Sequence, residues 1–179
     1  MPRYIAFLRA INVGSHIVKM DYLRKLFETM GMKNTETFIA SGNVIFDSAI
    51  SNKNELTEFI EESLCSVLGY QVAVFLRSTT ELAKIANYTP FNEHTNNTDQ
   101  NGLYIAFLTA APGQDVQKKL YAFSTDIDEF HVYGCEVYWL CRTKFSLSSF
   151  SGALLEKTLG MQTTIRNSTT IRKLAAKFT

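Results

Sequence analysis

The stretch Tyr4-Ile5-Ala6-Phe7-Leu8 occurs twice in this chain, the second time as Tyr104-Ile105-Ala106-Phe107-Leu108, 100 positions later. Each copy is a short apolar run with aromatic and β-branched residues, which favours a buried β-strand. Each copy leads into a loop that ends in a glycine, Gly14 or Gly113. A repeated buried strand with a similar exit predicts a repeated structural unit.

A second pair of matching segments lies downstream of the first. Leu-Gly-Tyr-Gln at 68–71 is followed by Ser-Thr-Thr at 78–80, and Leu-Gly-Met-Gln at 159–162 is followed by Ser-Thr-Thr at 168–170. The two separations are 91 and 90 positions, so the second copy is somewhat shorter than the first. Two matches in the same order indicate an internal duplication.

Apolar spacing and turn residues predict the elements of the first copy. After the strand at 4–8, apolar residues at 23, 26, 27 and 30 predict an amphipathic helix that Asp21 caps and Gly31 ends. Strands at 37–39 and 44–46 flank a hairpin turn at 40–43, where glycine and asparagine tolerate a positive φ. A helix from Asn52 to Gly69, a strand at 72–76 and a short helix opened by Ser78 and Glu81 follow.

The second copy predicts the same order of elements. We expect a strand at 103–109, a helix from about 115, a hairpin at 131–140, a helix at 151–159, a strand at 163–166 and a final helix. The order βαββαβ is that of the ferredoxin-like split βαβ unit. The predicted fold is therefore α+β, with duplicated ferredoxin-like units whose antiparallel sheets carry helices packed on one face. The predicted boundaries are 1–86 for the first unit, 87–101 for an Asn- and Thr-rich linker and 102–179 for the second unit.

Composition excludes several classes of protein. The 179 residues are 46% hydrophobic and 20% charged, which is typical of a globular chain. No apolar run approaches the ~20 residues of a membrane span, so we expect a cytoplasmic protein with no membrane partner. Three cysteines without a Cys-x-x-Cys pair and three scattered histidines predict no disulfide framework and no metal site. Nucleophile-elbow, Walker and dinucleotide motifs are absent from the sequence, so no cofactor is predicted.

Charge is distributed unevenly along the chain, although its formal net value is only +1. Residues 1–33 hold six Lys or Arg against two acidic residues, and residues 142–179 hold seven against one. The middle of the chain is correspondingly acidic. If the two ends meet in the fold, they form a patch that attracts anions. The alternative is that these charges spread over separate solvated faces.

A candidate site follows from the predicted pairing of the first and third strands. Antiparallel pairing places the end of one strand beside the start of the other, so the loop at 9–14 should adjoin the turn at 41–43. The candidate ligand-binding residues of this copy are Arg9, Asn12, Gly14, Lys19, Ser41, Gly42 and Asn43. Arginine and lysine bind oxyanions, and a helix N-terminus directs N–H groups toward them. The alternative is that the polar residues only shape turns, and a capping Asp21 would repel an anion.

The second copy offers further candidates at its own end. Arg166, Asn167 and Lys173 would supply a second set of anion contacts if the copies pack suitably. The alternative is a capped strand exit followed by a solvated basic helix face.

The motifs of these segments resemble one known family. Arg9-x-Ile-Asn-Val-Gly14, Thr37-x-x-x-Ser-Gly-Asn-Val-x-Phe46 and Arg166-Asn-x-x-Thr-x-x-Lys-Leu174, with Met20-x-x-Leu23 between the first two, are similar to the domain of unknown function 1697 family of bacterial proteins. The resemblance covers nearly the whole chain. It implies the duplicated α+β architecture but no established activity or cofactor. Ala10 and Ser15 stand where the family pattern would have glycine.

Four functional hypotheses remain open from the sequence. The first is a binding protein for a small anionic ligand, either phosphorylated or nucleotide-like. The second is an enzyme that acts on a phosphorylated metabolite, although these motifs offer no clear general base, so catalytic residues are not assigned. The third is a nucleic-acid-binding protein that uses the basic patch without reading the bases. Recognition of RNA on the sheet face is not favoured, because the third strand lacks the alternating aromatics of RNA-recognition modules. The fourth is self-association through sheet edges, with no oligomeric state predicted.

Overall fold

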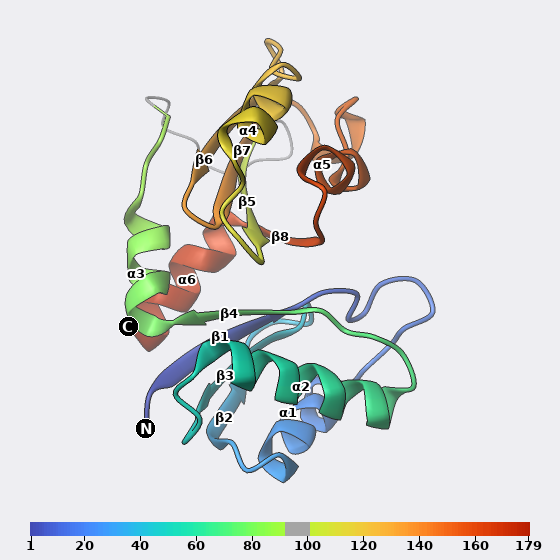
Figure 1. Ribbon diagram of the computed structural model, residues 1–179, viewed down its shortest axis with the longest axis vertical. Helices are drawn as coiled ribbons and strands as arrows, with labels where there is room; N and C mark the ends of the chain where they lie inside the picture. The colour runs from blue at the N-terminus through green and yellow to red at the C-terminus, as the bar shows by residue number, and fades with distance from the viewer. Residues whose placement is uncertain (92–100) are drawn as a thin grey trace. The chain divides into compact units, whose positions relative to one another are not determined.

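The computed structural model describes residues 1–91 and 101–179, so most of the linker predicted at 87–101 lies outside the described residues. The chain divides into two compact units (Figure 1). Unit 1 comprises Met1–Ala83 together with Phe178–Thr179, and unit 2 comprises Lys84–Lys177.

Unit 1 contains a four-stranded antiparallel sheet in the order β2-β3-β1-β4. Its elements in chain order are β1 (Arg3–Leu8), α1 (Met20–Thr29), β2 (Lys33–Thr37), β3 (Asn43–Asp47), α2 (Lys53–Leu68), β4 (Val74–Ser78) and the start of α3 (Thr79–Asn87). The repeated pentapeptide lies in β1, a central strand, as predicted.

Unit 2 has the same element order and a sheet in the corresponding order β6-β7-β5-β8. Its elements after α3 are β5 (Gly102–Leu108), α4 (Gln114–Tyr121), β6 (Asp128–Tyr133), β7 (Glu136–Cys141), a 3-10 turn at Phe145–Leu147, α5 (Gly152–Leu159), β8 (Thr163–Asn167) and α6 (Ser168–Phe178). The predicted α+β class and the two similar βαββαβ units are therefore confirmed.

Strand register shows how closely the two units correspond. The Leu8 N–H donates to the Gly42 carbonyl at 2.9 Å, and the Leu108 N–H donates to the Cys135 carbonyl at the same distance. Tyr4 lies opposite Ser78 in β4, however, and Tyr104 lies opposite Asn167 in β8. Ser78 therefore corresponds to Asn167 and not to Ser168, so the match of the two Ser-Thr-Thr segments is wrong by one position.

The core of unit 1 lies between its sheet and α1 and α2 (Figure 1). Alternate residues of β1, Tyr4, Ala6 and Leu8, face this core because side chains alternate along a strand. Leu23 and Phe27 of α1 and Leu56, Ile60 and Leu64 of α2 complete it, each less than 1% exposed. In unit 2, Leu120 of α4 and Leu155 and Leu159 of α5 pack in the same way around Ala106, Leu108 and Trp139.

Helix ends follow the predicted signals with one exception. The Asn52 side chain accepts from the N–H groups of residues 54 and 55 at the start of α2, and Gly69 ends this helix with φ 79°. Asp21 does not cap α1, because the helix begins at Met20, two residues earlier than a cap at Asp21 would place it. The N-cap is Lys19, and no side chain caps this end.

Several strand boundaries also differ from prediction. The hairpin expected at 131–140 begins three residues earlier, because β6 starts at Asp128. The strand expected at 37–39 is β2, which ends at Thr37, because Ile39 adopts φ 50° and leaves the strand conformation. The strand expected at 72–76 begins two residues later, at Val74. The backbone of the turn at 40–43 has its positive φ at Gly42, whereas Asn43 is already the first residue of β3.

Candidate functional site

The loop between β1 and α1, residues 9–19, is the centre of the candidate site. It begins where the Arg9 N–H donates to the Ala73 carbonyl at 2.9 Å. Ala10, Asn12 and Gly14 then adopt φ values of 61°, 56° and 60°. Two of these three residues are not glycine, and a left-handed conformation is unfavourable for alanine. The surrounding contacts must therefore hold the loop in this shape.

Asn12 supplies the contacts that hold the loop. Its Nδ2 donates to the Ala40 carbonyl at 2.8 Å, and its Oδ1 accepts from the Val18 N–H at 2.7 Å. The loop and the β2–β3 hairpin are therefore in contact, as the antiparallel pairing of β1 and β3 requires. The same two bonds engage both ends of the Asn12 amide, so this side chain positions the loop.

Gly42 is a point of close approach between the hairpin backbone and the end of β1 with the loop that follows it. It is buried with φ 76°, and a Cβ atom there would lie 3.0 Å from the Cβ of Ile11 and 3.2 Å from the Cβ of Leu8. Both contacts are with atoms attached directly to the backbone, so they cannot move aside easily. Glycine is needed here for packing as well as for conformation.

Asn43 and Ser41 belong to the interior of the hairpin. The Asn43 side chain is fully buried, and its Nδ2 donates to the Phe38 carbonyl at 2.9 Å and to Ser41 Oγ at 3.0 Å. The Phe38 N–H in turn donates to the Asn43 carbonyl at 3.0 Å. These bonds define the shape of the turn. Asn43 and Ser41 therefore have the turn-shaping role that was the alternative to ligand binding.

The cationic residues of the loop have a different environment. Arg9 is half-buried at the end of β1, and Lys19 is exposed at the start of α1. Gly14 is also exposed, with nothing within 4 Å of a Cβ built on it. Because Lys19 has no acceptor atom, it cannot cap the N–H groups of the first helical turn.

The candidates from unit 2 lie on β8 and α6. Arg166 is 8% exposed, and its Nη1 donates to Thr164 Oγ1 at 2.7 Å and to the Ile165 carbonyl at 2.9 Å. Burial lowers the pKa of Arg166 to about 10, so it is still charged at neutral pH. Asn167 accepts from the Thr169 N–H at 2.8 Å at the start of α6, and Lys173 is exposed on that helix.

Sequence reasoning missed Arg77, the counterpart of Arg166 in unit 1. Arg77 lies opposite Ile5, as Arg166 lies opposite Ile105, and both side chains are 8% exposed. Each Nη1 donates to the carbonyl of the preceding residue, at 2.8 Å for Arg77. The one-position error in matching the Ser-Thr-Thr segments concealed this correspondence, because it set Arg77 against Asn167.

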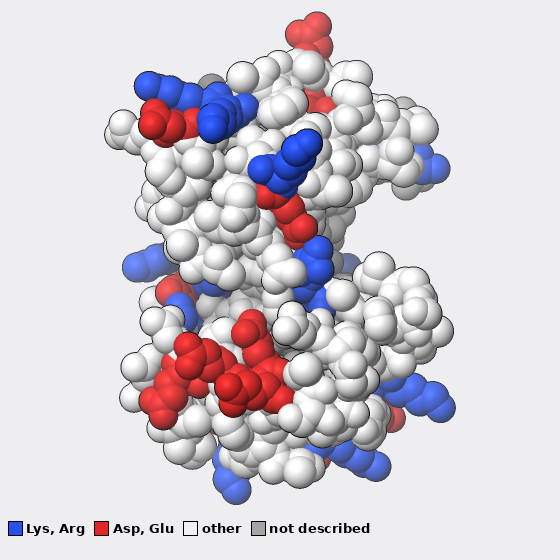
Figure 2. Space-filling view, turned by 45° about the vertical axis from the view of Figure 1, so that its right-hand side comes forward, with Lys and Arg blue, Asp and Glu red and all other residues white. Residues whose placement is uncertain are grey.

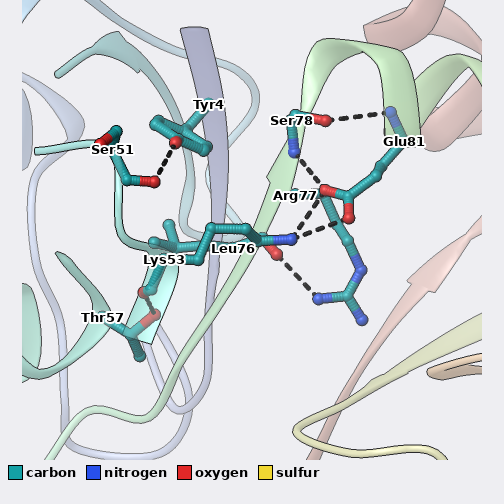
Figure 3. Close-up of polar contacts among 8 residues, drawn as sticks. All are labelled: Tyr4, Ser51, Lys53, Thr57, Leu76, Arg77, Ser78 and Glu81. Atoms are coloured by element: carbon teal, nitrogen blue, oxygen red, sulfur yellow. Dashed lines mark hydrogen bonds and ion pairs between the residues drawn. The ribbon is translucent and has the colours of Figure 1, made fainter. Parts of the chain in front are cut away.

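A second group missed from the sequence is the ion pair between α2 and α3 (Figure 3). Lys53 Nζ lies 2.8 Å from both carboxylate oxygens of Glu81. Glu81 Oε2 also accepts from the Ser78 N–H at 2.7 Å, while Ser78 Oγ accepts from the Glu81 N–H at 3.2 Å, which is the predicted capping box. Burial of Glu81 opposes its ionisation, but the bonds from Lys53 and Ser78 outweigh this effect and lower its pKa.

The third group missed is an aromatic pair between the loop and the segment that precedes β4. The ring of His16 packs on the ring of Tyr70 with a centroid distance of 3.9 Å and an interplanar angle of 34°. The Tyr70 hydroxyl is buried without a hydrogen-bond partner among the described residues, and burial raises its pKa. Their separation in sequence gave no signal for this contact.

The described part of the chain contains neither a candidate metal-binding cluster nor a candidate membrane-spanning helix. Within residues 1–91 and 101–179, no three His, Cys, Asp or Glu side chains are grouped so that they could hold a metal ion. No helix among those residues has the length and apolar character to cross a bilayer.

One known protein family matches the sequence of this chain. The family described as "Protein of unknown function (DUF1697)" matches residues 1–138, which is more than half of the sequence. The chain belongs to the DUF1697 family. The match includes the whole loop and hairpin of unit 1 and ends before Arg166, Asn167 and Lys173.

One solved structure shows the fold of this DUF1697 member in another protein. It is described as "The structure of conserved bacterial protein SP0830 from Streptococcus pneumoniae". The two chains are 24% identical with a TM-score of 0.72, and the match covers 99% of this chain and 98% of that one. No curated protein matches the chain. The comparisons therefore give a family and a fold without an activity.

Proposed function

We propose that this DUF1697 protein binds a small anionic ligand, a phosphorylated metabolite or nucleotide, on the loop at residues 9–19 of unit 1. The observation that carries the proposal is the loop itself. Asn12 fixes it to the hairpin through Ala40 and to the start of α1 through Val18, and it presents Arg9 and Lys19. A preorganised cationic loop binds an anion with a small loss of conformational entropy.

The start of α1 supports the same proposal. Its N-cap is Lys19 and no side chain caps it, so the helix presents backbone N–H groups and the positive end of its dipole beside a lysine. Asp21 lies in the first turn and reduces this attraction, but it does not make a capping bond. A phosphate or carboxylate is the ligand group that suits such an end.

We propose fewer contact residues than the sequence alone suggests. Asn12, Ser41, Gly42 and Asn43 hold the loop and hairpin together, so we assign them to the framework of the site. We propose Arg9 and Lys19 as the residues that contact the anion. Gly14 stays in the proposal as part of the exposed loop.

In unit 2, exposed Lys173 stays a proposal for a separate anion contact within that unit. Arg166 is buried on β8 and Asn167 caps α6, so we assign both to the framework of that unit.

Nucleic acid is the less favoured ligand. Figure 2 shows carboxylates gathered over α2, whose exposed acidic residues are Glu55, Glu58 and Glu62. A polymer with many phosphates would meet more of this negative charge than a small ligand does. Salt dependence separates the two, because each phosphate contact to duplex DNA adds roughly 0.9 to the slope of log K against log salt.

A thermal-shift screen tests the proposal in its general form. The panel contains inorganic phosphate, pyrophosphate, sugar phosphates and nucleotides, with neutral sugars and nucleosides as controls. A ligand that binds only the folded state raises apparent stability by RT ln(1 + [L]/Kd), about 2.7 kcal/mol at 100 times Kd. If no anion in the panel raises Tm while the protein is folded, the proposal is wrong.

The proposal also covers the origin of the two units and the cellular location of the protein. The two units share element order and register, which supports an origin by duplication of a ferredoxin-like unit. The bacterial source of the similar solved structure supports a bacterial origin, and a cytoplasmic location is part of the proposal.

A further inference from the structure

The loop of unit 1 is longer than its place in the fold requires. In unit 2, residues 109–113 connect β5 to α4, whereas in unit 1 residues 9–19 make the corresponding connection between β1 and α1. The additional residues include His16, which has no counterpart in the shorter loop. Long loops on a rigid scaffold commonly carry binding residues.

His16 is fixed at its backbone and at its ring. The His16 N–H donates to the Val13 carbonyl at 3.2 Å, and Gly14, with φ 60°, lies inside the turn that this bond closes. The imidazole then packs on Tyr70, which itself packs against the core of unit 1. His16 as a whole is exposed. One ring is thus held on a second ring that the core supports, and it remains accessible to solvent.

Arg9 contacts the same short segment of chain as His16. The backbone of Arg9 bonds to Ala73, and the ring of His16 packs on Tyr70, three residues earlier. Three residues span at most about 11 Å. The aromatic pair and the end of β1 that carries Arg9 therefore lie within the reach of one nucleotide.

We propose that the anionic ligand carries a flat aromatic ring, as a nucleotide does, and that this ring stacks on His16. The inference rests on the proposed function, because Arg9 and Lys19 would hold the phosphate of the same ligand. Stacking on an aromatic side chain tolerates any base, since every base has a π face. The site therefore distinguishes nucleotides from sugar phosphates more strongly than it distinguishes one base from another.

The test compares two nucleotides with ribose 5-phosphate, which lacks the aromatic ring, and with inorganic phosphate, which lacks the sugar as well. Calorimetric titrations use adenosine monophosphate, cytidine monophosphate, ribose 5-phosphate and inorganic phosphate. For the wild-type chain, we expect the two nucleotides to bind with similar affinity and both roughly ten-fold more tightly than ribose 5-phosphate. In His16→Ala, the nucleotides should bind no better than ribose 5-phosphate, whose own affinity should be unchanged.

Two further variants separate stacking from a structural role of His16. His16→Phe keeps a ring and should restore the preference for nucleotides. Tyr70→Phe removes only a buried hydroxyl that lacks a partner, so binding should stay as in the wild type and the fold should be retained.

Equal affinity for ribose 5-phosphate and the nucleotides in the wild type would overturn the stacking proposal and leave the anion site standing. Loss of ribose 5-phosphate binding in His16→Ala would also overturn it, because the ring would then act by shaping the loop. Absence of binding by all four ligands would overturn the stacking proposal, and the proposed function falls with it if no other anion of the thermal-shift panel binds either.

Discussion

The side-chain amide of Asn12 donates to the carbonyl of Ala40 at 2.8 Å and so joins the β1–α1 loop to the β2–β3 hairpin. The two residues are 28 positions apart in sequence. This bond, with the bond from the Val18 N–H to Asn12 Oδ1, holds the shape of the loop at residues 9–19, which begins at Arg9 and ends at Lys19.

Asn12→Ala is expected to destabilise the protein by about 2–3 kcal/mol, because it removes two hydrogen bonds and places alanine at φ 56°. Asn12→Gly removes the same bonds without the conformational strain, so it should be milder by about 1 kcal/mol. Urea unfolding measures both free energies. Equal values for Asn12→Ala and the wild type would show that the amide does not hold the loop.

Gly42→Ala is expected to destabilise the protein by roughly 2–4 kcal/mol, because the new methyl group would overlap Ile11 and Leu8 and the residue has φ 76°. Gly69→Ala is a matched control, with φ 79° and nothing within 4 Å of its Cβ position. The control should show only the conformational part, about 1 kcal/mol. A Gly42→Ala variant no less stable than the Gly69→Ala variant would contradict the close approach.

Without the Lys53–Glu81 pair, the free energy of unfolding should fall less steeply as the pH is lowered into the acid range. The pKa of Glu81 is lowered from its ordinary value of 4.5 in the folded protein, so its contribution is present above pH 4.5 and is lost as pH falls through the folded pKa. Because both side chains are more than a third exposed, the contribution should stay below about 1 kcal/mol.

The measurement for this pair is urea unfolding of Glu81→Gln at pH 7 and at pH 3. The difference in stability from the wild type should be larger at pH 7 and should shrink at pH 3. Glu58→Gln, an exposed substitution elsewhere on α2, is the control. A Glu81→Gln difference that grows at pH 3 would reverse the expected sign.

Asp128 is expected to contribute strongly to the stability of unit 2. Its carboxylate is 1% exposed and accepts from Trp139 Nε1 at 2.8 Å and from Ser148 Oγ at 2.6 Å. Asp128→Ala leaves the indole N–H and the hydroxyl without their acceptor and should destabilise by about 3 kcal/mol. Asp128→Asn keeps an acceptor for the indole and should be milder.

Trp139 is the single tryptophan of the chain, so its fluorescence reports on this contact directly. The emission of Asp128→Ala should differ from that of the wild type under native conditions. An unchanged spectrum and unchanged stability would show that the buried carboxylate is dispensable.

Much of the fold could be predicted because its signals are local. The repeated pentapeptide marked β1 and β5, and Asn52, Gly69 and the Ser78–Glu81 capping box marked helix ends. The start of α1 could not be predicted in this way. Asp21 has the chemistry of an N-cap, but the bond from Val18 to Asn12 brings the chain into the helix earlier.

The candidate site was predictable only in part, for the same reason. Strand pairing brought the loop and hairpin together, but burial decides which polar side chains face solvent. Asn43 and Lys19 both look like ligand contacts in the sequence, yet one is fully buried and the other exposed. The contact of His16 with Tyr70 depends on loop conformation, which no sequence period encodes.

The most direct test of the proposed anion site is calorimetric titration of the tightest anion from the thermal-shift screen into wild-type protein and three variants at 50 mM salt. Arg9→Ala and Lys19→Ala should each weaken binding by roughly ten-fold or more, as expected for the loss of a charge-assisted contact. Lys33→Ala removes an exposed lysine from the start of β2, at the opposite end of the sheet from the hairpin, and should bind as the wild type does. If Arg9→Ala and Lys19→Ala fold and bind the anion as tightly as Lys33→Ala, the loop at residues 9–19 is not the binding site.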